Sequence, residues 1–275
     1  MKNWKEILSN YPYLIWVLLY ATIFWAVFGA NAESLRMVSI IYGACLLIAI
    51  TPLSEWLWRV FQRVRPLATS REKERLQPIF DEVYEEALKI DKNLFKNIRL
   101  FIKDSMDLNA FAYGKGTLIL MRGSVEMLDD DDLKGIIAHE FGHFSNYDTV
   151  ALLFAKVSNM LMLLFMKCIN WITRLLLFVL SGQDPLVGTI VKIFYYPILW
   201  AYKTLILIGD LVLMRVSRKH EYYADQFAVK CGYGDSLLSA LYQLNEIAMN
   251  EPRSFFKELF NTHPPLVKRI EMLEQ

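Results

Sequence analysis

The chain has 275 residues, and its 30 lysines and arginines almost balance its 29 aspartates and glutamates, so that the formal net charge is +1. This near-neutral balance excludes the basic surface of a protein that coats nucleic acid. Hydrophobic residues make up 55% of the chain, which excludes disordered and collagen-like classes and exceeds the share in an ordinary soluble domain. The three cysteines form no Cys-x-x-Cys pair, so we expect neither a disulfide framework nor a thiolate zinc site, and a reducing compartment is favoured.

Two apolar stretches near the N-terminus predict helices that span a membrane. Asp, Glu, Lys and Arg are absent from residues 7–32 and again from residues 37–54, and a span needs about 20 such residues. A cleavable signal peptide is the alternative, because Lys2 and Lys5 precede the first stretch and Ala30-Asn31-Ala32 offers small residues for cleavage. We favour two spans, since the first stretch is longer than the apolar part of a signal peptide and the second follows closely.

Basic residues after the second stretch set the expected orientation. Arg or Lys occurs six times between residues 59 and 75, whereas the short connection between the two stretches holds one Arg and one Glu. Loops on the cytoplasmic side of a membrane carry an excess of basic residues. We therefore expect the chain after residue 59, and the N-terminus with it, on the cytoplasmic side of a bacterial-type cell membrane.

Residues 70–144 have the composition of a soluble domain. Apolar residues at helical spacing predict an amphipathic helix at its start. Three short strands are predicted next, the last two joined through Gly114-Lys115-Gly116, at residues 98–103, 108–113 and 117–121. The acidic run at residues 129–132 has no EF-hand spacing, so we interpret it as the cap of a following helix and not as a cation site.

A second apolar block runs from residue 149 to 216 and predicts a helical hairpin that turns near Ser181. Charges recur in each arm at spacings of 11 and 7 residues, which places each set on one helix face. The two sets are Lys156, Lys167 and Arg174, and Lys192, Lys203 and Asp210. These stripes either face each other or a wet cavity inside a bundle, or the arms lie in the membrane interface, and we favour a hairpin that spans the membrane.

His139-Glu140-Phe141-Gly142-His143 is an HExxH sequence on a predicted helix. The imidazoles of His139 and His143 lie one turn apart on one face, where both reach a single metal ion. Zinc suits imidazole and carboxylate ligands and leaves a position for a water, whose pKa it lowers toward about 7. Glu140 is able to approach that water without being a ligand. The alternative is a helix whose two histidines only pack or cap.

A catalytic zinc site needs a third protein ligand, and Glu221 is the best candidate. Glu221 and Asp225 lie one turn apart directly after the apolar hairpin, so that Glu221 would bind the metal while Asp225 accepts a hydrogen bond from a ligand imidazole. Without the HExxH sequence, this pair would be interpreted as a solvated helix face. A hairpin that crosses the membrane twice, or not at all, returns the chain to the side on which HExxH lies.

Together the motifs resemble the HtpX family of integral-membrane zinc metalloproteases, which is related to the prenyl-protein (CAAX) endoproteases. The similarity extends from the two N-terminal spans to the last helix. It rests on the HExxH helix, the Glu-Tyr-Tyr-Ala-Asp motif at Glu221, Asn109-Ala110-Phe111, and Thr262-His263-Pro264-Pro265. The resemblance implies one Zn²⁺ per chain, bound by His139, His143 and Glu221. It also implies Glu140 as general base and Asp225 as the carboxylate that supports a ligand.

Two further roles are implied by the resemblance. Asn109, Ala110 and Phe111 would form the edge strand along which a peptide substrate lies, in agreement with strand addition as a way to hold an extended chain. By the resemblance, His263 would stabilise the oxyanion of the reaction, whereas from the residues alone a histidine before Pro-Pro is more often explained by a hydrogen bond to a helix end. His220 stands where the family commonly has Arg.

These observations predict a mainly α membrane protein. About four transmembrane or membrane-associated helices accompany a zincin-like (gluzincin) α+β catalytic domain with a small β-sheet. The expected organisation is a two-span region at 1–65, the first part of the protease domain at 66–148, the apolar hairpin at 149–216, and the second part of the protease domain at 217–275.

The predicted function is that of a zinc-dependent endopeptidase that cleaves membrane or membrane-associated proteins at the cytoplasmic face for quality control. Its expected partners are polypeptide substrates and the lipid bilayer, and not nucleic acid. The alternatives are a processing protease with one specific substrate, a non-catalytic zinc-dependent membrane scaffold, and a transporter built on the charged stripes. Glu140 argues against a scaffold, because binding zinc needs the histidines but not the acid between them. A transporter is disfavoured because no repeat of half-helices is evident.

Overall fold

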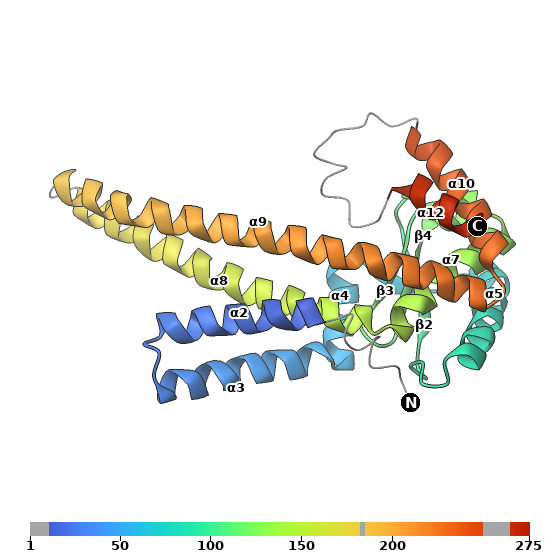
Figure 1. Ribbon diagram of the computed structural model, residues 1–275, viewed down its shortest axis with the longest axis horizontal. Helices are drawn as coiled ribbons and strands as arrows, with labels where there is room; N and C mark the ends of the chain where they lie inside the picture. The colour runs from blue at the N-terminus through green and yellow to red at the C-terminus, as the bar shows by residue number, and fades with distance from the viewer. Residues whose placement is uncertain (1–10, 182–184, 250–264) are drawn as a thin grey trace.

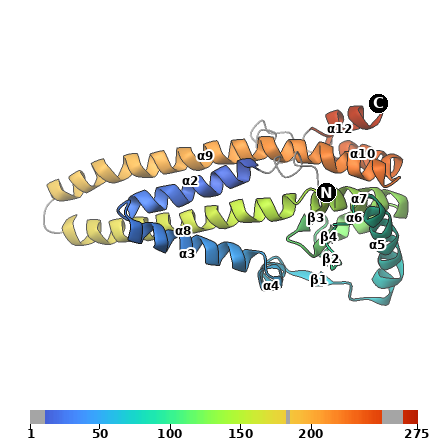
Figure 2. The ribbon, with the colours of Figure 1, turned by 60° about the horizontal axis from the view of Figure 1, so that its bottom comes forward.

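The computed structural model describes residues 11–181, 185–249 and 265–275. Four helices lie side by side and extend away from a second region in which the sheet and the other helices gather (Figures 1 and 2). These four helices are α2 (Tyr11–Val27), α3 (Ala32–Ala49), α8 (Asp148–Ser181) and α9 (Pro185–Lys230). We call the four helices the bundle and the other region the catalytic region. One end of α8 and one end of α9 reach into the catalytic region, so these two helices belong to both.

Helices α2 and α3 form an antiparallel pair at the N-terminal side of the bundle. Gly29 and Ala30 turn the chain between them with positive φ angles of 107° and 52°. Helix α3 is long and apolar enough to cross a membrane, and α2 is an apolar helix of 17 residues. The expected apolar pair is therefore present, but α3 ends at Ala49, because Pro52 starts a separate helix, α4 (Pro52–Phe61).

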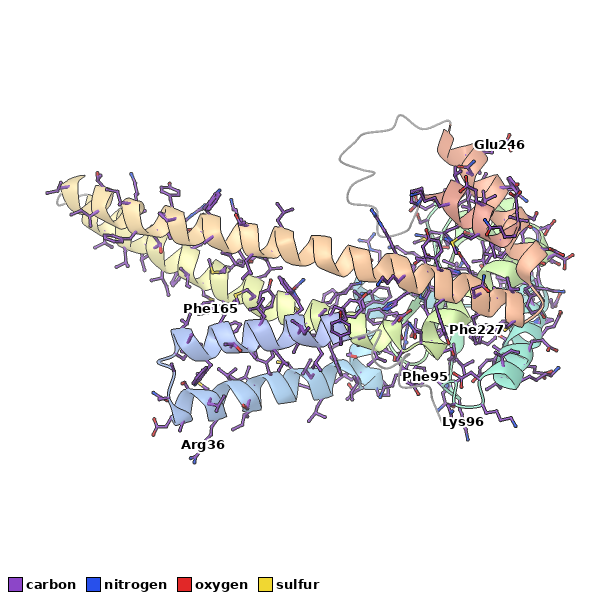
Figure 3. All side chains as sticks on the ribbon, in the orientation of Figure 1. Arg36, Phe95, Lys96, Phe165, Phe227 and Glu246 are labelled. Atoms are coloured by element: carbon purple, nitrogen blue, oxygen red, sulfur yellow. The ribbon has the colours of Figure 1, made fainter. Side chains whose placement is uncertain are left out.

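Helices α8 and α9 form the predicted hairpin, and its outer part extends beyond the turn between α2 and α3 (Figure 1). In length and composition, Asp148–Val179 also meets the requirements of a membrane span. Nearer the catalytic region, α2 packs on α8. The indole Nε1 of Trp16 donates to Asn159 Oδ1 (2.8 Å), and the rings of Phe24 and Phe165 lie 5.0 Å apart. Figure 3 shows Phe165 beside α2.

The charged stripes of the hairpin do not face each other. All five lysine and arginine side chains of the two stripes are exposed, namely those of Lys156, Lys167, Arg174, Lys192 and Lys203. The alternative in which the stripes oppose one another is therefore wrong for these residues, while the side chain of Asp210 lies outside the described part of the structure. Long basic side chains on the outside of an apolar helix are able to extend their charge toward a polar boundary.

Four short strands form a mixed sheet in the order β1-β2-β4-β3. They are β1 (Val64–Pro66), β2 (Arg99–Lys103), β3 (Ala110–Tyr113) and β4 (Thr117–Met121). Strands β2 and β4 are parallel, and the other two pairs are antiparallel. The three predicted strands are present, whereas β1 was not predicted. It is short and contains a proline, which an edge strand tolerates because one side of it donates no ladder hydrogen bonds.

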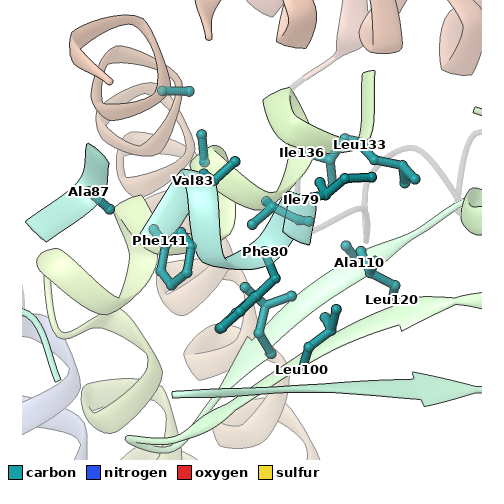
Figure 4. Packing of buried hydrophobic residues seen from close by; sticks show 14 of the residues in the cluster. Ile79, Phe80, Val83, Ala87, Leu100, Ala110, Leu120, Leu133, Ile136 and Phe141 are labelled. Carbon is teal, nitrogen blue, oxygen red and sulfur yellow. The ribbon is translucent and has the colours of Figure 1, made fainter. Parts of the chain in front are cut away.

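The hydrophobic core lies between the sheet and α5 (Ser70–Ile90) and α7 (Asp130–Ser145). Phe80 and Phe141, with ring centroids 5.5 Å apart, lie near Leu100 and Leu120 of the sheet (Figure 4). Among the described residues, α6 (Arg122–Met127), α10 (Gly234–Met249) and α12 (Leu266–Leu273) also belong to this region. At the start of α7 the Asp129 side chain accepts from the backbone N–H of Asp132 (2.8 Å), so the acidic run caps the helix as predicted.

Candidate metal centre and active site

Helix α7 carries the HExxH residues into the centre of the catalytic region, where α9 crosses it closely. Gly142 permits this approach, because a Cβ at that position would lie only 2.6 Å from the Cα of Ala224 on α9. His139 and Glu140 are buried, and His143 is half-buried. The close crossing brings the imidazoles of α7 toward the carboxylate of Glu221 on α9.

Three ligand atoms gather at this crossing. His139 Nε2 lies 3.4 Å from Glu221 Oε2, and His143 Nε2 lies 3.5 Å from Glu221 Oε1. One donor atom from each of the three residues lies within 4.8 Å of the others. Two imidazoles and one carboxylate at this separation fit a single zinc ion, which bonds nitrogen and carboxylate oxygen at about 2.0–2.2 Å. The sequence-predicted ligands are thus brought together, and the donor set matches the chemistry of zinc.

Asp225 and Arg269 support the imidazole of His139. Asp225 Oδ1 lies 2.8 Å from His139 Nδ1, the ring nitrogen that points away from Glu221. The guanidinium of Arg269 donates to both oxygens of Asp225, with Nε–Oδ2 at 2.9 Å and Nη2–Oδ1 at 2.5 Å. The remaining guanidinium nitrogen, Nη1, lies 3.4 Å from Glu221 Oε2. The C-terminal helix α12 therefore reaches the metal centre through one buried arginine.

Asp148 plays the corresponding part at His143. Its Oδ2 lies 3.1 Å from His143 Nδ1, and its Oδ1 lies 2.9 Å from His220 Nδ1. Asn146 donates a further hydrogen bond to Oδ1 (2.6 Å). Tyr147, with a φ of 61°, makes the turn from α7 into α8, so that the first residue of the long apolar helix supports a candidate metal ligand.

The groups around the metal centre favour the charged forms of its histidines and of Asp225. Burial by itself lowers the pKa of His139 and of His143, but the neighbouring carboxylates outweigh it and raise both above the ordinary value for histidine. Burial raises the pKa of Asp225, but His139 and Arg269 outweigh it and hold the carboxyl below its usual range. An anionic Asp225 is the form that accepts a hydrogen bond from a metal-bound imidazole.

Glu140 faces the edge strand β3. Its Oε2 accepts a hydrogen bond from the backbone N–H of Ala112 (2.7 Å). Asn109 accepts from the backbone N–H of Met121 (3.0 Å), and hydrogen bonding alternates along an antiparallel strand, so Ala110 and Ala112 direct their backbone groups away from β4. The carboxylate of Glu140 thus lies between the candidate metal ligands and the free edge of the sheet.

The three residues of the expected substrate strand lie at this edge in different settings. The side chain of Asn109 accepts from the N–H of Ala110 (2.9 Å), and Ala110 itself is buried. The side chain of Phe111 points to the face of the sheet opposite to that of Ala110, and its ring lies 5.5 Å from the ring of Trp58 on α4. His263 falls outside the described residues.

Sequence reasoning missed Asp148, Arg269 and the role of His220. Asp148 follows His143 by five residues, a spacing that a continuous helix would place on another face. Only the turn at Tyr147 brings its carboxylate back to the imidazole. Arg269 gives no local signal, because its partner Asp225 is 44 residues away along the chain. His220, noted only as a departure from Arg, is buried against Asp148.

An HExxH helix with a carboxylate from a second helix is the arrangement of a metallopeptidase, and this one is joined to long apolar helices of the kind found in membranes. The model of peptidase family M48 matches residues 70–275. The chain therefore belongs to peptidase family M48, and the resemblance found in the motifs is confirmed.

Curated relatives and one solved structure show how far the likeness extends. A "Protease HtpX homolog" of Tropheryma whipplei (strain TW08/27) is 32% identical over 202 residues, which cover 64% of this chain and 65% of that protein. The Bacillus subtilis (strain 168) protein of the same name is 26% identical over 273 residues, covering 92% of this chain and 88% of its own length. The aligned part thus spans less than two thirds of the Tropheryma protein.

The crystal structure of S. mikatae Ste24p has a TM-score of 0.53 to this chain at 19% sequence identity, covering 94% of this chain and 61% of that one. This likeness supports the overall fold, including the bundle.

Proposed function

We propose that this chain is a zinc-dependent endopeptidase of the gluzincin type. The observation that carries the proposal is the gathering of donor atoms from His139, His143 and Glu221 within 4.8 Å of one another, with Glu140 beside them. Zinc bound there would supply an activated water and polarise the scissile carbonyl. Glu140 would take a proton from the water and pass it to the leaving amine. Asp225 would hold the imidazole of His139 in the required tautomer.

The free edge of β3 supports strand addition as the mode of substrate binding. A peptide that lies beside Ala110 and Ala112 would pair with their outward backbone groups and run past Glu140. A carbonyl oxygen of the peptide would then compete with the carboxylate of Glu140 for the N–H of Ala112. In this proposal Asn109, Ala110 and Phe111 form the substrate strand, and His263 stabilises the oxyanion.

We further propose that α2, α3, α8 and α9 are four transmembrane or membrane-associated helices, and that the catalytic region lies at the cytoplasmic face of a bacterial-type cell membrane. Arg63 and Arg65, which follow α4 closely, support that orientation. The relatives are named as proteases, which supports polypeptide substrates, and we propose that these substrates are membrane proteins cleaved for quality control. A processing protease with one substrate would use the same site. A non-catalytic scaffold would need no buried acid aimed at the edge strand.

The test compares the purified protein with its Glu140→Gln variant in detergent, with zinc added and casein or the chain itself as substrate. We expect cleavage to fall by about 10²–10⁴-fold, the range for loss of a general base, while one zinc per chain is retained. Equal cleavage by the two proteins would contradict the proposal. Loss of zinc from a folded Glu140→Gln protein would show that Glu140 is a ligand.

A further inference from the structure

Helix α4 has two faces of opposite character. Its apolar side chains recur at the helical spacing of three and four residues and form one outward stripe, which we call the α4 stripe: Leu53, Trp56, Leu57, Val60 and Phe61. All five are exposed, with Trp56 at 52% and Phe61 at 80%. The other face carries Glu55, Trp58 and Arg59, which are buried or half-buried. A ten-residue helix that exposes its apolar face needs an apolar partner there.

The inner face of α4 binds the turn between β3 and β4. Glu55 accepts from the backbone N–H of Lys115 (2.7 Å) and from the hydroxyl of Thr117 (2.8 Å). Gly114, with a φ of 62°, lies against the Glu55 carboxyl, where a Cβ would collide with it. Arg59 also donates to Thr117 (2.6 Å). The turn of the hairpin is therefore fastened to α4 by side chains from one face of that helix.

Aromatic contacts extend this attachment to the strand itself. The indole of Trp58 stacks on the ring of Tyr113 at 4.1 Å with an interplanar angle of 12°. It also meets the ring of Phe111 edge-on at 5.5 Å. Phe111 and Tyr113 are residues of β3. One edge of this strand pairs with β4, and its free edge faces Glu140. The position of α4 thus sets the position of the edge beside the metal centre.

The position of α4 in the chain identifies what covers its stripe. Only two residues separate α4 from α3, and the end of α3 also exposes apolar side chains, those of Leu47 and Ile48. Figures 1 and 2 show α4 at the junction between the bundle and the catalytic region, turned away from the direction of α3. The exposed stripe continues the apolar surface of a helix that is long and apolar enough to span a membrane. A tryptophan within such a stripe is typical of the boundary between lipid and water.

We propose that α4 lies in the lipid headgroup region of the membrane with its stripe toward the acyl chains, and that it thereby holds β3 at the membrane surface. Polypeptides attached to the membrane would then meet the edge of β3 at a high local concentration, whereas soluble polypeptides would not. The second half of this inference rests on the proposed function, since it requires β3 to bind substrate. The first half does not.

Lipid quenching tests the first half. In the full chain with Cys45→Ala and Cys168→Ala, a polarity-sensitive fluorophore is attached at Phe61→Cys or Trp56→Cys. Cys231 stays, because burial raises the pKa of its thiol to about 12 and keeps it unreactive. The labelled proteins are reconstituted in phosphatidylcholine and phosphatidylglycerol vesicles that contain spin-labelled lipid, with the spin label either near the headgroup or deep in the acyl chain. Controls are Lys96→Cys in the catalytic region, labelled in Figure 3, and Ile40→Cys on the exposed face of α3.

We expect the probes on α4 to lose most of their fluorescence to the shallow spin label and less to the deep one. The Ile40 probe should respond to the deep label, and the Lys96 probe to neither. Probes on α4 that behave like the Lys96 probe would overturn the proposal, whether water or a second copy of the chain covers the stripe. Energy transfer between labelled copies would separate those two outcomes.

Cleavage of two forms of one substrate tests the second half. We compare wild-type protein with the Trp56→Glu, Phe61→Glu variant on soluble casein and on casein coupled to a lipid anchor, in the same vesicles. The variant should raise KM for the anchored form by about tenfold or more and leave kcat/KM for soluble casein unchanged. An equal change on both forms, or no change on either, would overturn the coupling. A wild-type protein that cleaves neither form would contradict the proposed function, while the quenching result would stand.

Discussion

The metal centre of the catalytic region and the bundle bury opposite kinds of side chain. Around the metal centre the buried residues are charged, and each contacts a partner, as Asp225 contacts His139 and Arg269. In the bundle the buried residues are aromatic or aliphatic, such as Tyr20 and Met162. The comparison predicts that different kinds of substitution destabilise the two regions. The catalytic region is sensitive to the loss of one charge, because its partner stays buried and unpaired. The bundle is sensitive to the loss of volume.

Removal of the third ligand should have the largest effect. Glu221→Ala takes away the only carboxylate within 4.8 Å of both ligand imidazoles in the described cluster, so zinc retention should collapse. Asp225→Ala removes a supporting group only and should weaken zinc binding by about 10–100-fold. Competition with a chromogenic chelator measures both affinities. If Asp225→Ala lost more zinc affinity than Glu221→Ala, Asp225 would be the ligand and Glu221 the supporting group.

Arg269→Met should unfold the catalytic region at lower denaturant concentration without removing a metal ligand. The substitution leaves Asp225 buried beside His139 with no guanidinium, and breaking one side of a buried pair costs about 3–5 kcal/mol. The double variant Arg269→Met, Asp225→Leu removes both charges and serves as the matched control. Denaturant unfolding followed by circular dichroism gives the two free energies. If the double variant were no more stable than the single one, the charge argument would fail for this region.

Met162→Ala tests whether the bundle is sensitive to a loss of buried volume. Met162 is buried against α2, and truncation to alanine should cost about 2–5 kcal/mol through lost packing and a cavity. Met162→Leu keeps most of the volume and should cost less than about 1.5 kcal/mol. Thermal unfolding in detergent distinguishes the two variants. Similar losses in both would show that shape, and not volume, controls packing between α2 and α8.

Asp148→Asn should have a smaller effect because it keeps the shape of the side chain. The neutral amide no longer supports His143 as a carboxylate does, so we expect zinc affinity to fall by about 10-fold. His220→Gln is the control, because it alters the other contact of Asp148 and leaves the contact with His143 in place. If the two variants weakened zinc binding equally, the contact between Asp148 and His143 would carry no special weight.

The smallest expected effect lies away from both the metal centre and the bundle. Hydrogen bonds from Arg65 lower the pKa of Glu72 to about 2, and backbone N–H groups at the start of α5 contribute. Because the folded pKa is below the unfolded one, this contribution to stability is present above about pH 4.5 and is lost as the pH falls toward 2. Solvent screening reduces it to about 1 kcal/mol. Glu72→Gln should therefore narrow the difference in stability between pH 7 and pH 3, measured by denaturant unfolding.

Much of the fold was predictable because its signals are local. Apolar stretches indicated α2, α3 and the hairpin of α8 and α9, and strand patterns indicated β2, β3 and β4. Strand β1 was missed, since three residues with a proline carry no alternating pattern. Helix α4 was missed because its first residues continue the apolar composition of the preceding span. Spacing placed the charges of each arm of the hairpin on one helix face and left open whether the two faces oppose one another. The observed exposure of the lysines and arginines shows that spacing sets a face but not its direction.

The sequence by itself determined which residues share a helix face, because the helical period is fixed by backbone geometry. That period was enough to select His139, Glu140 and His143, and to propose Glu221 with Asp225. Only the tertiary structure decided which faces meet. The crossing of α7 over α9 at Gly142, the arginine that α12 inserts beside Asp225, and the turn at Tyr147 that returns Asp148 to His143 all depend on contacts between distant segments. No local pattern encodes such contacts, since each is stabilised by burial that exists only when the whole region is packed.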